Sequence, residues 1–289
     1  MLPGGVLAIT SGEGDGNIAV RFVAARDDTD PQALAACRAS SLAARRFQWL
    51  MGMARTNDGF LACGLTDPSA ALYKFALNGS MDELATVPPL GDFSEGFRQC
   101  AVHQQTQRAF ALGDNEASGM QSLFILDSHL QVIATVEATE EVIVDDDDDD
   151  DDDVKVDDAI CDLAVHGDNV IVLTSGRHPE GPGLRLLDLD GRFLRTIAAG
   201  LFPNPHAVAA SHGRAFVVNG EDEDDEDDEE DRVRYVLHVI DIHSGDILQQ
   251  VRFYFGGSIS AVLVNGDEIY IASFRAATIV VLPFAGSDA

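Results

Sequence analysis

The sequence predicts an all-β fold, a β-propeller of about six four-stranded blades, within a range of five to seven. Three observations predict it: a hairpin pattern recurs along the chain, a second pair of apolar runs precedes most of the hairpins, and the hairpins are spaced by about one blade. The chain has 289 residues, 46% of them hydrophobic, which suits one large β domain with its own core. We therefore expect a single domain over residues 1–289.

The recurring hairpin consists of an apolar run of about five residues, a short polar turn and a second alternating run. Alternation with a period of two marks a strand with one buried face. Asn-Gly or Asp-Gly between two such runs marks a tight turn, because glycine accepts the positive φ that the turn requires; Asn78-Gly79 and Asp190-Gly191 are examples. The hairpins are Leu72–Val87, Leu123–Val136, Leu184–Ile197, Leu237–Val251 and the truncated Ile279–Phe284.

A second pair of short apolar runs precedes each of the last four hairpins, so the repeating unit has four strands. A four-stranded blade buries its faces only against neighbouring blades, and units of this kind must therefore stack into a ring. The paired runs are Cys100–His103 with Ala109–Leu112, Leu163–Val165 with Val170–Leu173, Val208–Ala210 with Ala215–Val218, and Ala261–Val264 with Ile269–Ala272.

The spacing of the hairpins is that of propeller blades. Successive hairpins begin 51, 61, 53 and 42 residues apart. Two acidic inserts, 145–158 and 221–231, fall in the second and third intervals, and without them the period is 42 to 51 residues. A blade takes about 40–50 residues, so the 264 residues outside the inserts are enough for about six blades.

The two ends of the chain leave the closure of the ring open. The last unit supplies three strands and lacks an obvious fourth. The first segment, Val6–Thr10 with Asn17–Val23, is a hairpin without a preceding strand. Either these N-terminal strands complete the last blade, or the first blade is partial. Pro31–Arg46 is rich in alanine and begins with proline, which favours a short helix inserted between blades.

Most of the negative charge lies in two runs. The formal net charge is −30, but Asp145–Asp153 and Glu221–Asp231 hold 20 of the 49 acidic residues, and the rest of the chain has a net charge of −10. An acidic protein repels nucleic acid and anionic membranes, so neither is expected as a partner. Like charges at this density cannot be buried, and both inserts are expected to be disordered.

The order of strands in a blade places both acidic inserts on one rim of the ring. The turns between strands one and two, and between strands three and four, lie on one rim; the other connections lie on the opposite rim. The insert 145–158 joins two blades, and 221–231 joins the second and third strands of one blade. Solvated loops are one interpretation. An acidic rim that recruits a basic protein segment, or chelates Ca²⁺ weakly, is the other.

Three segments resemble known propeller repeats. Phe202–Gly220 resembles the first half of a repeat of the NHL and TolB-like group of six-bladed propellers, and Leu184–Ile197 resembles its second half. Leu237–Val251 is also similar to a YVTN-type repeat. No Trp-Asp dipeptide or kelch Gly-Gly signature appears. The resemblance implies a fold that serves many functions, from protein binding to lactone hydrolysis.

Propeller ligands usually bind at the starts of the innermost strands, facing the channel. Aligning the units on their first turns gives one channel position with Phe97, Ile160, His206 and Ile259, and a next position with Arg98, Cys161, Ala207 and Ser260. Zinc requires three or four protein ligands, whereas only His206 qualifies. A ring of acidic ligands for calcium is also missing. We therefore predict no catalytic residue, metal ligand or cofactor. The predicted binding residues at the channel mouth are His206, Arg98, Asp162 and Asn204.

Two recurring residue types are predicted to be structural. His103, His166 and His212 lie at turns between first and second strands, dispersed around the ring. Asp127, Asp188 and Asp241 end third strands, where an aspartate can accept hydrogen bonds from the following turn.

The cysteines and the N-terminus predict an intracellular protein. Cys37, Cys63, Cys100 and Cys161 are scattered without a disulfide or zinc spacing and are expected to be reduced. The first residues lack the features of a signal peptide. We expect the cytoplasm, with the nucleus as the alternative.

The sequence favours a non-catalytic, monomeric propeller that binds a protein partner on its acidic rim, with a basic protein as the candidate partner. The alternative is a six-bladed hydrolase or lyase, similar to a metal-dependent lactonase, with its site at the channel mouth near His206 and Asp162.

Overall fold

The computed structural model describes twenty-one strands in six antiparallel sheets. Pro31 and Gln32 are helical and exposed; the rest of the helix expected at 31–46 lies outside the described residues, as do the acidic inserts apart from Glu221. The described residues are 6–12, 18–24, 31–32, 49–65, 70–76, 83–87, 97–115, 120–137, 160–175, 182–221, 232–273 and 278–284.

Four of the sheets are blades with four strands, and each blade follows the chain from its innermost to its outermost strand. The first blade contains β3 (Trp49–Arg55), β4 (Gly59–Leu65), β5 (Ala70–Ala76) and β6 (Glu83–Val87). The second contains β7 (Phe97–Val102), β8 (Ala109–Asn115), β9 (Met120–Leu126) and β10 (Val132–Glu137). The third contains β11 (Ile160–His166), β12 (Asn169–Thr174), β13 (Gly183–Asp188) and β14 (Phe193–Ile197). The fourth contains β15 (Pro205–Ser211), β16 (Arg214–Gly220), β17 (Arg232–Asp241) and β18 (Ile247–Gly256).

The two remaining sheets are the fifth blade and the N-terminal hairpin. The fifth blade has three described strands, β19 (Ile259–Asn265), β20 (Glu268–Ser273) and β21 (Thr278–Pro283). β1 (Val6–Gly12) and β2 (Ile18–Ala24) form a two-stranded sheet of their own. The N-terminal strands therefore do not complete the last blade by backbone pairing, which was one of the two expectations from sequence.

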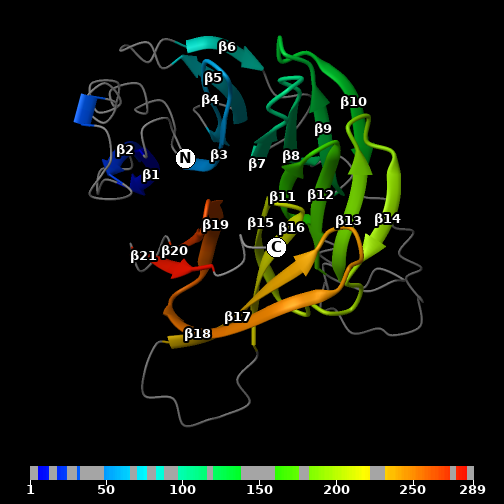
Figure 1. Cartoon of the computed structure of the whole chain (residues 1–289). Helices are drawn as coiled ribbons and strands as arrows, with labels where there is room; N and C mark the ends of the chain where they lie inside the picture. Colours follow the sequence, from blue (N-terminus) through cyan, green and yellow to red (C-terminus); the bar gives the residue numbers. More distant parts are fainter. Residues whose placement is uncertain are drawn as a thin grey trace, which may run out of the picture.

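The fold is an all-β propeller of five blades, within the predicted range of five to seven. Figure 1 shows the blades arranged around a common centre, with their first strands innermost. The first strands of neighbouring blades contact each other from β3 through β7, β11 and β15 to β19. The hairpins predicted from the alternating pattern are the outer halves of these blades.

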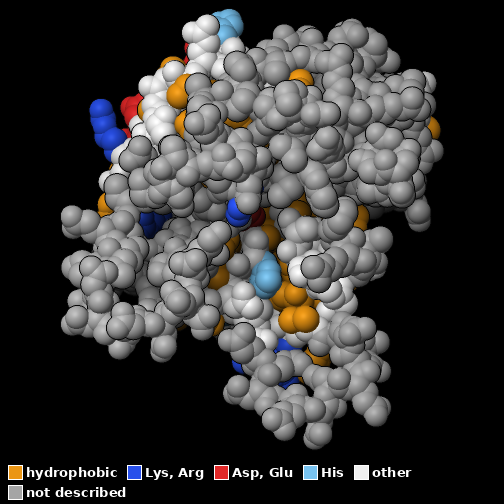
Figure 2. All heavy atoms as spheres, turned by 180° about the vertical axis from the view of Figure 1, so that it is seen from behind, with side chains coloured by type: hydrophobic (Ala, Val, Ile, Leu, Met, Phe, Trp, Pro, Cys, Tyr) orange, Lys and Arg blue, Asp and Glu red, His pale blue; other side chains and the backbone are white. Residues whose placement is uncertain are grey.

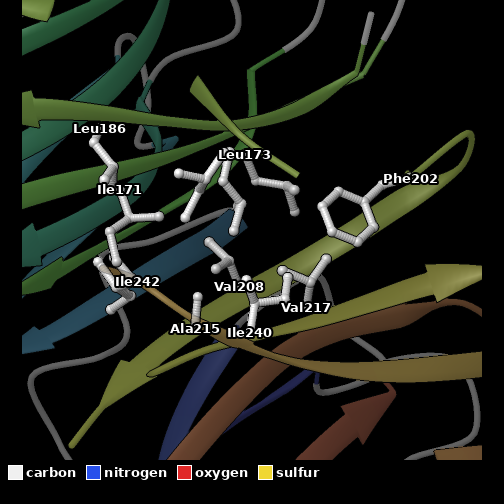
Figure 3. Packing of buried hydrophobic residues seen from close by; sticks show 12 residues of the cluster. Ile171, Leu173, Leu186, Phe202, Val208, Ala215, Val217, Ile240 and Ile242 are labelled. Carbon is white, nitrogen blue, oxygen red and sulfur yellow. The ribbon is translucent and has the colours of Figure 1, made fainter. Parts of the chain in front are cut away.

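Buried hydrophobic side chains join each of the first four blades to the next. Between the third and fourth blades, Leu173 and Leu186 face Val217 and Ile240 across the gap, and Phe202, from the connection between the two blades, closes one side of the cluster (Figure 3). Burying one such side chain contributes roughly 1.5–3 kcal/mol. Because every cluster draws on two blades, no blade can bury its own faces alone.

The recurring aspartates have the structural role predicted for them. One carboxylate oxygen of Asp127 accepts backbone hydrogen bonds from His129 and Gln131, at 2.8 and 2.9 Å. Asp188 and Asp241 each accept two backbone N–H groups of their own turns in the same way. These bonds stabilise the turn between the third and fourth strands.

The recurring histidines lie at turns, as predicted, but two of them are closer together than expected. His103 Nδ1 is 2.7 Å from Thr106 Oγ1 within its own turn. His166 Nε2 accepts a hydrogen bond of 2.9 Å from the backbone N–H of Gly213, which follows His212 in the next blade. Hydrogen bonds therefore connect the third and fourth blades on this rim. Arg195 adds a second one, of 2.7 Å, to the carbonyl of Ile242.

The turn glycines of the third blade provide a test of this close contact between blades. Gly191 has φ +83°, and a Cβ there would lie 2.6 Å from Val136 Cγ2 and 2.7 Å from Ile125 Cδ1 in the second blade. Gly167 has φ +55° with open space around it. Both alanine variants carry backbone strain of about 1–2 kcal/mol. We expect Gly191→Ala to lower the free energy of unfolding by a further 1–3 kcal/mol or so, because the added methyl group overpacks the contact with the second blade.

The measurement is urea unfolding of both variants, with Gly167→Ala as the matched control. Equal losses in the two variants would contradict close packing of the third blade's turn on the second blade.

Candidate functional site at the channel mouth

A β-bulge interrupts each innermost strand at the same point. The register skips one residue near the start of the strand in all five blades. A bulge of this kind re-aims a side chain and is common beside functional sites. The skipped residues form a ring around the mouth, called the bulge ring below: Met51, Arg98, Cys161, His206 and Ser260.

The bulge ring corrects the alignment made from sequence. His206 was aligned with Phe97 and Ile160, but the register pairs it with Arg98 and Cys161. Pro205 occupies the apolar position instead, and it is buried. The available signal was that proline, which fits a bulge or a strand's first residue better than a ladder position.

His206 and Asn204 lie together at the mouth. The His206 ring packs edge-on against Tyr235, with centroids 5.3 Å apart. A Cβ added at Gly220 would lie 2.7 Å from Asn204 Nδ2 and 3.1 Å from His206 Nε2, so the two side chains meet over this glycine. His206 Nε2 is buried and lacks a hydrogen-bond partner among the described residues. Burial lowers the pKa of His206, so the ring is neutral at pH 7.

Asp162 was predicted to bind a ligand, but its carboxylate is occupied by the protein itself. It is buried, and Oδ1 accepts the N–H of Leu163 while Oδ2 accepts the N–H of Val208, both at 2.7 Å. The Gln99 side chain adds a further hydrogen bond. Asp162 therefore ties β7, β11 and β15 together. Burial raises the pKa of Asp162 to about 6, against the lowering effect of these hydrogen bonds.

The Gln99 amide extends this connection to the first blade. Its Oε1 accepts the N–H of Cys100 at 3.2 Å. Gly52 of β3 stands at the equivalent position, and a Cβ there would collide with Gln99 Oε1. Glycine is therefore required at position 52 for Gln99 to reach across the inner strands.

The remaining bulge positions differ in chemistry. Arg98 is exposed, and the third blade lies between it and His206. The Ser260 hydroxyl donates to the carbonyl of Ala272 at 3.1 Å. Cys161 is half-buried and hydrogen-bonded to Ser175, and burial raises the pKa of its thiol. Of the four predicted binding residues, the structure brings His206 and Asn204 together, assigns Asp162 to the scaffold and leaves Arg98 apart.

No three His, Cys, Asp or Glu side chains gather into a metal-binding group in the part of the chain that the structure describes. Cys63 and Cys100 are free and buried, and Cys37 lies outside that part. None of the helical residues described forms a segment long and apolar enough to cross a membrane.

The fourth blade carries an open pocket of about 610 Å³ that no sequence pattern indicated. It lies between the connection that follows β14 and one face of β16, β17 and β18. Figure 2 shows one hollowed face of the molecule, where hydrophobic side chains and a histidine are exposed near the middle. The residues that line the pocket are Leu201, Pro203, Asn219, Gly220, Glu221, Arg234, Val236, His238, Gln250 and Arg252.

Comparison with known proteins identifies the fold but no family. No family model and no curated protein matches the chain. Hydrazine synthase of Kuenenia stuttgartiensis has a TM-score of 0.60 at 12% identity, over 98% of this chain and 77% of that one. A chain of a nidogen/laminin complex has a TM-score of 0.56 at 9% identity, over 96% and 89%. Raptor of Chaetomium thermophilum has 0.54 at 11%, over 97% of this chain and 22% of that one. These similarities show a shared propeller architecture.

The buried carboxylate predicts a specific pH dependence of stability. An unfolded aspartate has a pKa of about 3.9, whereas that of folded Asp162 is about 6. The folded state therefore holds the proton more tightly. Asp162 contributes a loss of stability of roughly 2 kcal/mol as pH rises from 4 to 7.

We expect Asp162→Asn to remove this component, so that the variant loses less stability than the wild type over the same range. Urea midpoints at several pH values would measure it. Asp190→Asn is the control, because Arg108 lowers the pKa of this exposed carboxyl, so its titration lies below the tested range. Parallel curves for wild type and Asp162→Asn would refute the assignment.

Proposed function

We propose that this propeller is a non-catalytic binding module that holds a Lys/Arg-rich segment of a partner protein against its acidic rim. The observation that carries the proposal is the placement of charge. The two acidic runs contain 20 of the 49 acidic side chains, and we infer from the order of strands that both belong to connections of the same rim. Propellers serve widely as scaffolds for such surfaces, and their function depends on the site rather than the fold.

The described ends of the two runs support a common rim. The first run lies between the end of β10 at Glu137 and the start of β11 at Ile160. The second lies between Glu221 and the start of β17 at Arg232. The start of an innermost strand and the end of a second strand lie at the same side of an antiparallel blade. This is also the side of the bulge ring.

The chemistry of the channel mouth also favours binding over catalysis. The Asp162 carboxylate accepts hydrogen bonds from two backbone N–H groups and a glutamine side chain, and the Ser260 hydroxyl donates one to a backbone carbonyl. Catalytic acids and bases need to reach a substrate proton. Charge of one sign on a rim instead accelerates association with an oppositely charged segment.

A salt titration tests this function. A Lys/Arg-rich peptide should bind the protein, and its affinity should fall at least about tenfold between roughly 0.05 and 0.3 M NaCl, because salt screens exposed charges. A variant with both acidic runs changed to Asn and Gln should lose most of the binding. Fluorescence anisotropy would measure both effects.

The control for this experiment is an acidic peptide of equal length, which should not bind. Basic-peptide binding that is insensitive to salt, or that persists in the neutralised variant, would remove the acidic rim as the binding surface.

A hydrolase or lyase is the second candidate, and one observation favours it: the buried Nε2 of His206, beside Asn204, has no hydrogen-bond partner within the described part of the chain. A neutral imidazole in this position could act as a general base. If the protein hydrolyses lactones or esters, His206→Ala should lower the rate by about 100-fold or more. His212→Ala, at the opposite rim, is the control. Equal rates for both variants would exclude His206 as the base.

A further inference from the structure

We infer that Arg234 and Arg252, in the pocket of the fourth blade, form a clamp for a carboxylate of the partner segment. The inference rests on the proposed function, because it names a second determinant of the same partner: an Asp or Glu placed among its basic residues. Three features of the pocket favour an Asp or Glu of the partner: its charge, its geometry and its position beside the second acidic run.

Glu221 fixes both arginines from within the protein. Its Oε2 is 3.4 Å from Arg234 Nε, and its Oε1 accepts a hydrogen bond of 3.1 Å from Arg252 Nε. Glu221 is itself held by its backbone N–H, which donates to the carbonyl of Arg234 at 3.0 Å. The two guanidinium groups therefore lie on either side of one carboxylate in a defined orientation.

Each guanidinium is fixed yet accessible. Arg234 donates to Tyr254 Oη at 3.1 Å and lies over the Tyr254 ring, 5.6 Å from its centroid. The Arg234 and Arg252 side chains are 43% and 69% exposed. A guanidinium has five N–H donors and pairs well with carboxylates. Because both side chains are partly exposed, a carboxylate from outside can contact the clamp from the solvent side.

The side chains that line the pocket carry a net positive charge. Two arginines face one glutamate there, and His238 adds no charge at neutral pH, because burial lowers its pKa. Gln250 Nε2 lies 3.1 Å from His238 Nδ1 and occupies this ring nitrogen. Leu201 is 43% exposed at the rim of the pocket and offers apolar surface to residues next to the bound carboxylate.

The neighbouring sequence determines what kind of anion can enter. Residues 222–231 are all acidic and follow Glu221 directly. Their charge repels a free anion and attracts a Lys/Arg-rich segment. A carboxylate embedded in such a segment satisfies the acidic run and the clamp together. The pocket thus selects mixed-charge segments over purely basic ones.

The test uses two peptides, acetylated and amidated: Lys-Arg-Lys-Ala-Leu-Glu-Leu-Ala-Lys-Arg and its counterpart with Gln in place of Glu. The full-length wild type should bind the Glu peptide about tenfold more tightly than the Gln peptide at low salt. Arg252→Gln and Arg234→Gln should each reduce this ratio to near one. Arg192→Gln, an exposed arginine in a turn of the third blade, removes the same charge and should keep the full ratio.

The outcomes separate the two proposals. If both peptides bind the wild type equally, the clamp is overturned while the acidic rim stands. If neither peptide binds, the proposed function fails, and the clamp fails with it. If Arg192→Gln abolishes the ratio as well, the preference reflects net charge, and the clamp is again overturned. Circular dichroism spectra of the variants, which carry exposed substitutions, would establish that each is folded.

Discussion

The whole molecule depends on one constraint: a blade can hide its apolar faces only against another blade. The buried clusters at the interfaces all draw side chains from two neighbouring sheets. Near the axis, the same dependence takes a polar form, because the Asp162 carboxylate bonds to β11, to Val208 of β15 and to Gln99 of β7. Packing holds the outer parts of the blades, and a hydrogen-bonded carboxylate holds their inner strands.

Much of this architecture could be predicted from sequence, because apolar residues and turn residues recur along the chain at regular intervals. Alternation of apolar residues around Gly-containing turns marked the outer hairpins, and Asp188 could be assigned to its turn from its place at the strand end. Both signals are local. The number of blades could not be predicted as closely. The alternating pattern of the N-terminal hairpin predicts two paired strands, but it does not indicate whether they belong to a blade.

The candidate site was harder to predict, because its geometry depends on features without a periodic signature. A β-bulge adds one residue, which moved His206 into the row of Arg98 and Cys161. Asp162 looked like a ligand because burial and partners cannot be read from residue type. The pairing of the two arginines could not be predicted for a similar reason. Arg234 and Arg252 are 18 positions apart in the chain, and each forms an ion pair with Glu221.

The seam between the two ends of the chain has a mechanical consequence. In many rings, a strand from one terminus pairs with the blade of the other, so backbone hydrogen bonds lock the circle. Among the described strands, β1 and β2 pair only with each other, and β19–β21 remains a separate sheet. Tension across this seam therefore breaks no backbone hydrogen bond between the hairpin β1–β2 and the sheet β19–β21.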